Sequence, residues 1–375
     1  MKPRSPFLDL ATVNAPYLAE IKEAVTRVID SGWYIGGPEV EGLEQELKGF
    51  IGAEHAIGVS NGLDALRLIL RGYIELGRLK PGDEVIVNAN TYIASVLAIT
   101  DCGLRPVLAE PSPLTANLTA ETIAQALRTS NARAVMLVHL YGRTAWDDDI
   151  ARVVADNNLL VIEDVAQAIG ARYYDKDKTV MTGAIGDAGA FSFYPTKNIG
   201  AMGDAGAVTT SDTELATVIK ALRNYGSDYR YHNIYAGLNC RLDPVQAAIL
   251  RVKLPYTDRE NTMRREVAHV YDQFITNPLV TKPLYVDDFS MVWHQYAVLV
   301  DDRERFRGFL ADRGVATDVN YPKAVHQQPC YTSLAPDGSL PAAEDYCRRV
   351  VSLPISSCTS VDDAAQIAAI INQYQ

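Results

Sequence analysis

The sequence has no run of apolar residues long enough to cross a membrane, which takes about 20 consecutive and mostly apolar residues. Its first ten residues, MKPRSPFLDL, also lack the apolar core of a secretory signal. The five cysteines and six histidines are dispersed, without the spacing of metal ligands. We therefore expect a cytoplasmic protein with free thiols, without a membrane partner and without a metal site.

Positive charge is also in short supply. The chain carries 35 lysines and arginines against 46 aspartates and glutamates, which gives a formal net charge of −11. An acidic surface repels the phosphates of nucleic acids, so we expect no nucleic-acid partner. An anionic ligand would need a local pocket that holds it against the overall field.

The 375 residues, of which 48 % are hydrophobic and 22 % charged, suffice for a large core and two domains. Short apolar runs alternate with helical patterns along the first 250 residues. The expected strands are 55–59, 84–87, 105–110, 134–140, 159–164, 188–193 and 206–210. Nearly all-apolar strands separated by helices predict an α/β fold with a mostly parallel seven-stranded sheet covered on both faces. Ligands of such sheets bind beyond the carboxyl ends of the strands.

The pattern changes near residue 250. Residues 251–274 read as one long helix with a polar face, and further strands are expected at 294–301, 316–321 and 350–356. We therefore predict a large domain over residues 1–250 and a smaller α+β domain over residues 251–375. Two amphipathic helices expected at 17–32 and 40–52 belong to the first span, and the sequence leaves open whether they pack on the small domain.

Polar residues follow three of the predicted strands. Ser60-Asn61-Gly62 joins a strand to a helix, where free N–H groups and the helix dipole can hold a phosphate, although a simple helix cap explains the same residues. Asp164 ends another strand, either beside a ligand or as a cap. Lys197 follows a third strand in a stretch with few charges, where partial desolvation would make it a nucleophile.

Together these residues meet the needs of pyridoxal-5′-phosphate (PLP) chemistry. PLP needs a lysine for its Schiff base, a carboxylate that keeps its pyridine nitrogen protonated, and a cradle for its phosphate. Lys197, Asp164 and the turn at Gly62 can supply the three groups. Tyr92 follows another strand and could stack on the ring, although an isolated tyrosine is more often part of a core.

At this point the chain resembles the DegT/StrS-type sugar aminotransferases, a branch of the fold type I, aspartate-aminotransferase-like PLP enzymes. The resemblance rests on segments along nearly the whole chain: SGWYIGGPEVEGLEQEL, SNGLDALRLIL, VHLYG, VIEDVAQAIGA, GDAGAFSFYPTKNIGAMGDAGAV and RNYGSDYRYHNIYAGLNCRLDPVQAAIL. The segments EDVAQA and FSFYPTKNIG, in this order, are the most specific. The implied large domain, over residues 1–250, binds PLP, with pyridoxamine 5′-phosphate as the intermediate form.

The resemblance implies a role for each matching residue near the cofactor ring. Lys197 would form the Schiff base and later move the proton, Asp164 would pair with the pyridine nitrogen, and Gln167 would lie near the ring hydroxyl. Some relatives have histidine in place of this lysine and are dehydratases or deoxygenating enzymes. Because this chain keeps Lys197, transamination is favoured.

The resemblance also implies how the phosphate is held. Ser192 and the backbone groups of Gly62 and Leu63 would bind it, and Asn239 would reach it across a dimer interface. The active site would then be shared within a homodimer. Leu63 departs from the threonine of many relatives, so one hydroxyl contact is lost while the N–H remains.

The implied amino donor is L-glutamate, and the implied acceptor is a dTDP-linked 3-keto-6-deoxyhexose, which would become a dTDP-3-amino-3,6-dideoxyhexose. A 4-aminotransferase acting on a nucleotide-linked 4-keto-6-deoxyhexose is the alternative, because such relatives share the core motifs. The candidate substrate contacts are Tyr194, Tyr321, His326 and Arg241. The histidine could equally be structural, and the arginine could equally form a surface or interface salt bridge.

Two other classes of protein stay open at this point. A non-catalytic, PLP-binding regulatory protein of the same fold is disfavoured by the intact set of Lys197, Asp164 and Gln167. A nicotinamide-dependent sugar oxidoreductase would place a G-x-G-x-x-G turn after its first strand, where this chain has SNGLDAL.

Overall fold

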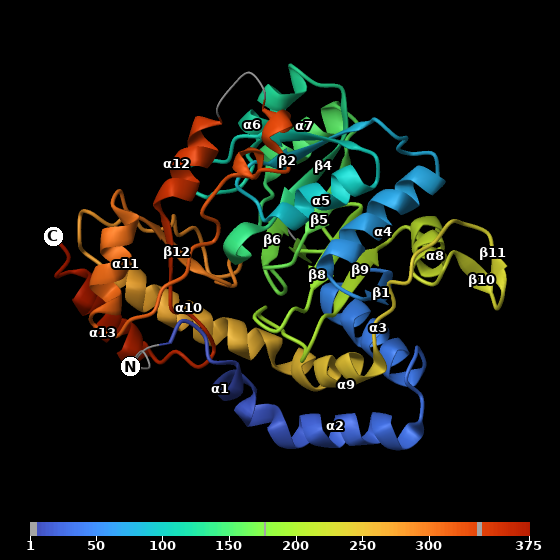
Figure 1. The fold of residues 1–375 in the computed structure, drawn as a ribbon, viewed down its shortest axis with the longest axis horizontal. Helices are drawn as coiled ribbons and strands as arrows, with labels where there is room; N and C mark the ends of the chain where they lie inside the picture. The colour runs from blue at the N-terminus through green and yellow to red at the C-terminus, as the bar shows by residue number, and fades with distance from the viewer. Residues whose placement is uncertain (1–5, 176–177, 336–339) are drawn as a thin grey trace.

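A seven-stranded sheet forms the centre of the computed structural model, which describes residues 6–175, 178–335 and 340–375 (Figure 1). Its strands are β1 (His55–Val59), β2 (Glu84–Asn88), β3 (Arg105–Ala109), β4 (Ala132–Val138), β5 (Leu160–Asp164), β8 (Ala188–Ser192) and β9 (Gly206–Thr210). They lie in the order β1-β9-β8-β5-β4-β2-β3. Only β9 runs antiparallel to its neighbours in this sheet. The prediction of a mostly parallel seven-stranded sheet is therefore confirmed.

Helices cover both faces of this sheet because successive strand residues point to opposite sides. Val85 and Val87 of β2 pack with one set of helices, whereas Ile86 between them packs with another. The first set is α4 (Gly62–Glu75), α5 (Ile93–Asp101) and α8 (Thr213–Leu222). The opposite face carries α3 (Pro38–Ile51), α6 (Ala120–Leu127), α7 (Asp148–Asp156) and α9 (Pro244–Lys253).

The N-terminal helices lie on α9. Ile21, Ala24 and Val28 of α2 (Leu18–Ser31) are buried against Ala248 and Ile249 of α9. The short helix α1 (Leu10–Asn14) precedes α2. The sequence left open whether the N-terminal helices pack on the small domain. In the structure, α2 packs on α9, most of which lies within the first 250 residues.

The chain after residue 253 builds a second hydrophobic core. Its helices are α10 (Thr257–Phe274), α11 (Arg303–Ala311), α12 (Pro341–Arg349) and α13 (Val361–Ile371). They accompany an antiparallel pair, β12 (Tyr296–Leu299) with β13 (Val350–Leu353). Residues from Val267 to Tyr374 form this core among themselves, as an α+β unit would. The division into domains at residue 250 stays a prediction.

Two expected elements differ from the structure. The helix expected over 251–274 is interrupted by a 3-10 turn at Leu254–Tyr256, because Pro255 has no N–H for the helical ladder. The strand expected at 316–321 is reduced to one bridge between Asp318 and Ser352.

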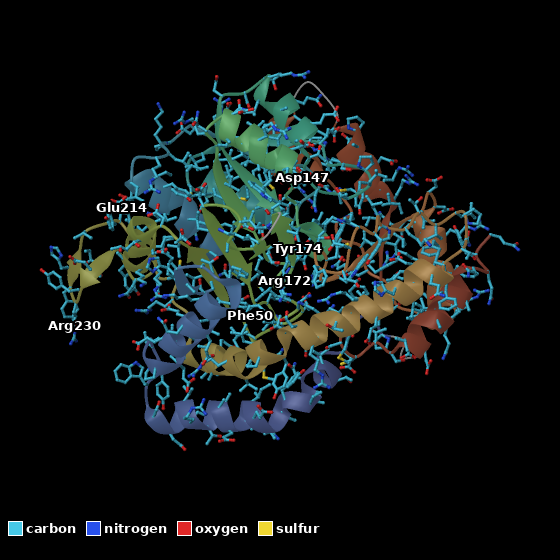
Figure 2. All side chains as sticks on the ribbon, turned by 180° about the vertical axis from the view of Figure 1, so that it is seen from behind. Phe50, Asp147, Arg172, Tyr174, Glu214 and Arg230 are labelled. Atoms are coloured by element: carbon cyan, nitrogen blue, oxygen red, sulfur yellow. The ribbon has the colours of Figure 1, made fainter. Side chains whose placement is uncertain are left out.

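Two small hairpins stand apart from the central sheet. One pairs β6 (Arg172–Asp175) with β7 (Lys178–Met181), and the other pairs β10 (Ser227–Tyr229) with β11 (His232–Asn233). The second hairpin projects from the edge of the molecule, with Arg230 at its tip (Figure 2). Tyr231 beside it is 85 % exposed. No helix among the described residues is long and apolar enough to cross a membrane.

Candidate active site

A cavity of about 540 Å³ lies beyond the carboxyl ends of the parallel strands. The residues predicted for cofactor or substrate that line it are Gly62, Leu63, Tyr92, Asp164, Gln167, Ser192, Tyr194, Lys197 and Tyr321. They come from turns that follow β1, β2, β5 and β8 and from the segment that follows α11, so the fold brings together residues far apart in the sequence.

Lys197 stands on the turn after β8, where its N–H donates to the carbonyl of Tyr194 at 2.8 Å. Burial disfavours the charged amine and lowers the pKa of Lys197 to about 8, against a smaller opposing effect of the Asp164 carboxylate. A larger fraction of this amine is neutral near physiological pH than for an exposed lysine. The side chain is therefore a competent nucleophile and proton acceptor.

Asp164 ends β5 and is only 7 % exposed. Its Oδ2 accepts a hydrogen bond from the Ser95 hydroxyl at 2.8 Å, and its Oδ1 accepts one from the N–H of Ala166 at 3.1 Å. Thr91 Oγ1 lies 3.0 Å from Ser95 Oγ and completes the chain of hydroxyls. These hydrogen bonds fix the orientation of the carboxylate in the cavity wall.

Gln167 has its amide group fixed from both ends. The N–H of Tyr141 donates to its Oε1 at 2.6 Å, and its Nε2 donates to the hydroxyl of Tyr321 at 3.1 Å. A backbone N–H can only donate, so this contact sets which end of the amide faces the cavity. The cavity side of Gln167 is consequently its donor end.

The turn at Gly62 forms a close contact with β8. Asn61 caps α4 by accepting from the N–H of Asp64 at 2.8 Å, and the helix begins at Gly62. The first N–H groups of a helix have no acceptor within it, so those of Gly62 and Leu63 are available to a ligand. A Cβ on Gly62 would lie 2.7 Å from Cβ of Ser192. Glycine therefore lets the helix terminus and the Ser192 hydroxyl approach one small space.

Aromatic side chains form the outer part of the cavity. The rings of Tyr92 and Tyr321 lie 5.1 Å apart at 33°. Tyr92 is 54 % exposed and Tyr194 is 52 % exposed, although both side chains line the cavity. The outer part is thus open to solvent in a single chain.

Three predicted site residues do not line this cavity. Asn239 is exposed, and Arg241 donates to the side chain of Asn224 at 3.0 Å while it stacks over the ring of Tyr225. His326 is 8 % exposed, and its Nε2 lies 2.9 Å from a carboxylate oxygen of Glu344. The predicted contact between His326 and a substrate stays a prediction. In this structure the ring is buried and its Nε2 pairs with Glu344 of α12.

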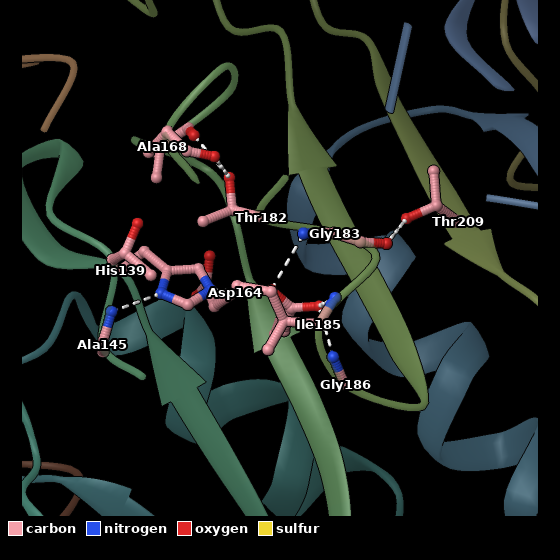
Figure 3. A network of polar contacts seen from close by, with 12 residues as sticks. His139, Ala145, Asp164, Ala168, Thr182, Gly183, Ile185, Gly186 and Thr209 are labelled. Atoms are coloured by element: carbon pink, nitrogen blue, oxygen red, sulfur yellow. Dashed lines mark hydrogen bonds and ion pairs between the residues drawn. The ribbon is translucent and has the colours of Figure 1, made fainter. Parts of the chain in front are cut away.

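A buried acid network lies behind Asp164 (Figure 3). The N–H of Ala145 donates to Nδ1 of His139 at 2.9 Å, so Nε2 carries the ring proton that faces Glu163 at 2.9 Å. Glu163 also accepts from the N–H groups of Gly183, Ile185 and Gly186 at 2.8 to 2.9 Å. The network fixes the turn before β8, and hence the strand that leads to Lys197.

Sequence reasoning missed several polar residues of the cavity wall. They are Thr91, Thr196, Asp204, His294, Gln295 and Asn320. His294 and Gln295 come from the segment before β12, which looked like an ordinary strand. Two adjacent polar residues at the start of an apolar strand were the only feature of the sequence that could have indicated a role in the site. Among the described residues, no cluster of three or more histidine, cysteine or acidic side chains could hold a metal ion.

Known proteins resemble this chain over almost its full length. The model of the DegT/DnrJ/EryC1/StrS aminotransferase family matches residues 17–372. A dTDP-3-amino-3,6-dideoxy-alpha-D-galactopyranose transaminase from Aneurinibacillus thermoaerophilus is 46 % identical over 98 % of this chain and 99 % of its own. A dTDP-3-amino-3,4,6-trideoxy-alpha-D-glucose transaminase from Streptomyces venezuelae is 43 % identical over 99 % of this chain and 96 % of its own.

Solved structures agree with these relatives. The crystal structure of DesV from S. venezuelae, in complex with a ketimine intermediate, superposes with a TM-score of 0.93 at 41 % identity. It covers 99 % of this chain, which covers 98 % of that protein. The predicted fold type I architecture and the predicted enzyme class are thereby confirmed. This chain belongs to the DegT/DnrJ/EryC1/StrS aminotransferase family.

Proposed function

We propose that this protein uses PLP to transfer the amino group of L-glutamate to carbon 3 of a dTDP-linked 3-keto-6-deoxyhexose, giving a dTDP-3-amino-3,6-dideoxyhexose. The observation that carries the proposal is the meeting of Lys197 and Asp164 in one cavity, with a helix N-terminus at its floor. Both relatives described above are named for dTDP-3-amino sugars, which favours carbon 3 over carbon 4.

The cavity residues fit PLP group by group. Asp164 offers a charged acceptor for the pyridine nitrogen, and the donor end of Gln167 suits the ring hydroxyl. The N–H groups at Gly62 and Leu63, with the Ser192 hydroxyl, suit a phosphate, because a residue without a Cβ lets the helix terminus lie directly beside Ser192. When bound, PLP supplies an electron sink for the substrate carbon and carries the amino group between the two substrates.

The side chains of this chain then perform the remaining tasks. Lys197 holds the cofactor covalently, and its freed amine takes the proton from one carbon and returns it to another. Asp164, oriented by Ser95 and Ala166, would pair with the ring nitrogen and so favour its protonated form. Tyr92, Tyr194 and Tyr321 line the cavity. Tyr92 would stack on the ring, and Tyr194 and Tyr321 would contact the sugar.

A second copy of the chain completes the site in this proposal. Lys197 is the only lysine or arginine among the described residues that line the cavity, which also contains Asp164 and Asp204. The substrates bring a diphosphate and carboxylates, so positive charge must come from elsewhere. Asn239 and Arg241 lie outside the cavity of their own chain and are our candidates to enter that of a partner.

The surface of the chain supports such a homodimer. Trp33, Tyr34 and Ile35 follow one another and are each more than half exposed. Consecutive apolar side chains exposed in this way are typical of a surface that another molecule covers. The homodimer remains a prediction. The cytoplasmic location and the absence of membrane and nucleic-acid partners also remain predictions.

A product assay tests the proposed reaction. The protein is incubated with PLP, L-glutamate and dTDP-4-keto-6-deoxyglucose, with and without a 3,4-ketoisomerase, and the new C–N bond is located by NMR. We expect an amine at carbon 3 that forms only with the isomerase. An amine at carbon 4 without the isomerase would instead establish the 4-aminotransferase. A protein that binds PLP but never yields its pyridoxamine form with glutamate would be regulatory.

A further inference from the structure

His294 stands in the cavity wall beside Lys197, just before β12. The ring is 8 % exposed, and its Nδ1 lies 2.9 Å from Oδ1 of Asn198, the residue that follows the lysine. The other ring nitrogen, Nε2, has no hydrogen bond recorded to any described residue, although the ring borders the cavity. Nδ1 is therefore hydrogen-bonded within the protein, whereas Nε2 can bond to a group in the cavity.

The protonation of the tied nitrogen follows from a chain of amides. Asn198 Nδ2 donates to the carbonyl of Val292 at 3.0 Å and to Oδ1 of Asn261 at 2.8 Å. Asn261 is oriented in turn, because its Nδ2 donates to the carbonyl of Ile169 at 3.0 Å. Backbone carbonyls accept only, so both amides have one permitted orientation. Oδ1 of Asn198 thus faces His294 as an acceptor, and Nδ1 of His294 carries a proton.

The charges around the ring keep it neutral. Burial, followed by the positive charges of Lys197 and Arg264, lowers the pKa of His294 well below its usual value. Arg264 comes from α10 on one side, and Asp164, Asp204 and Tyr321 border the same cavity. A neutral ring with its proton on Nδ1 presents an unprotonated Nε2, which can only accept a hydrogen bond.

We propose that His294 is a positioning residue, whose fixed Nε2 acceptor takes a hydrogen bond from Nζ of Lys197 whenever that amine carries the transferred proton. The inference rests on the proposed function, in which the amine of Lys197 is freed during each half-reaction. A lysine amine moves on a flexible four-carbon stem. The acceptor on His294 holds it within reach of the reacting carbons, and the proton remains on Nζ because the histidine is the weaker base.

The substitution His294→Asn separates this role from support of the fold. An asparagine amide can still donate to Asn198 from near the place of Nδ1, but it has no counterpart of Nε2. We expect kcat to fall by about tenfold, with KM for both substrates unchanged. The exposed His269, which pairs with Asp288 on the surface, provides the matched control His269→Asn, with unchanged kcat.

A titration of the apoprotein provides a reading that does not depend on turnover. ¹³C NMR of lysine labelled at Cε, assigned with Lys197→Ala, reports the pKa of the Lys197 amine. Because the ammonium loses an acceptor, its pKa in His294→Asn should be lower than in the wild type, by about one unit. An unchanged pKa would overturn the proposal even if the enzyme is an active aminotransferase.

The wild-type protein gives an independent check should the variant fail to fold. ¹⁵N NMR of labelled histidine should show His294 with Nδ1 protonated and Nε2 bare throughout pH 5 to 9. A proton on Nε2 in this range would refute the inference. Should the wild type lack transaminase activity, the NMR readings still report the contact between His294 and Lys197, so the two failures are distinguishable.

Discussion

The inner and outer walls of the cavity differ in how completely one chain builds them. On the inner wall, Asp164, Gln167 and His294 each have their orientation fixed by hydrogen bonds within the chain. On the outer wall, Tyr92 and Tyr194 are more than half exposed, and no arginine of the described residues is present. The groups proposed for chemistry are thus oriented within a single chain. The outer wall has no arginine for the proposed anionic substrates among the described residues, which is why we propose that a second copy supplies positive charge.

The largest effect is expected from Lys197→Ala on the inner wall. Without the amine there is neither covalent attachment nor proton transfer, so turnover should fall by at least about 10³-fold. PLP should still bind through Asp164 and the phosphate cradle, as equilibrium dialysis would measure. The exposed Lys220 of α8 supplies the control Lys220→Ala. Full activity of Lys197→Ala would remove the proposed mechanism.

The next effect is expected from Asp164→Asn, which keeps the shape of the inner wall but removes its charge. The amide oxygen can accept from Ala166 while the amide N–H donates to Ser95, which passes its proton toward Thr91. The variant should therefore fold, with an unchanged midpoint of unfolding in urea. Activity should fall by about 10²–10³-fold because the ring nitrogen loses its counter-charge. A wild-type rate would mean that the carboxylate only caps the turn; Asp156→Asn on the surface is the control.

Asn239→Ala tests the outer wall, where the expected loss is smaller. One hydrogen bond to a phosphate would be removed, so PLP affinity should fall by about 10–100-fold. Mixing this variant with Lys197→Ala sharpens the test. If Asn239 acts across subunits, one of the two sites in a hybrid dimer is intact, so at a PLP concentration too low to fill the sites of Asn239→Ala the mixture should be more active than either variant alone. No recovery in exchanging dimers would place Asn239 in its own chain's site or in neither.

The smallest effect is a pH dependence of PLP capture by the apoprotein. Only the neutral amine attacks the aldehyde, and the pKa of Lys197 is lowered to about 8. Between pH 7 and pH 9 the neutral fraction, and with it the capture rate measured by absorbance, should rise by about tenfold. The rate should then level off. A rate that keeps rising through pH 10 would show an amine that titrates like an exposed lysine.

Sequence patterns predicted the sheet well because its strands are short, apolar and buried on both faces. All seven were found. Asp164, which ends β5, and Lys197, on the turn after β8, were recognisable because each lies in a specific motif. The strand expected at 316–321 was wrong, since an alternating pattern also suits an extended loop that makes a single bridge.

The roles of other residues could not be derived from local patterns. Ser95 contacts a carboxylate 69 positions further along the chain, and the partner of His294 is Asn198, 96 positions away. Contacts of this kind depend on how helices and loops return to the sheet, which periodicity does not encode. The role that we propose for Asn239 involves a second chain, so neither the sequence pattern nor the fold of one chain specifies it.

The pairing register of β5 decides which of two adjacent acids faces the cavity. Glu163 and Asp164 are consecutive, so their side chains leave the strand on opposite sides. Leu137 and Gly189 flank the first, and Val138 and Ala190 flank the second. A slip of one residue would turn Glu163, which has its hydrogen-bond donors in the protein interior, toward the cavity. The same slip would bury Asp164 away from its own donors. The carboxylate that lines the cavity is thus placed by backbone pairing in the sheet, and a change in that pairing would exchange the two acids.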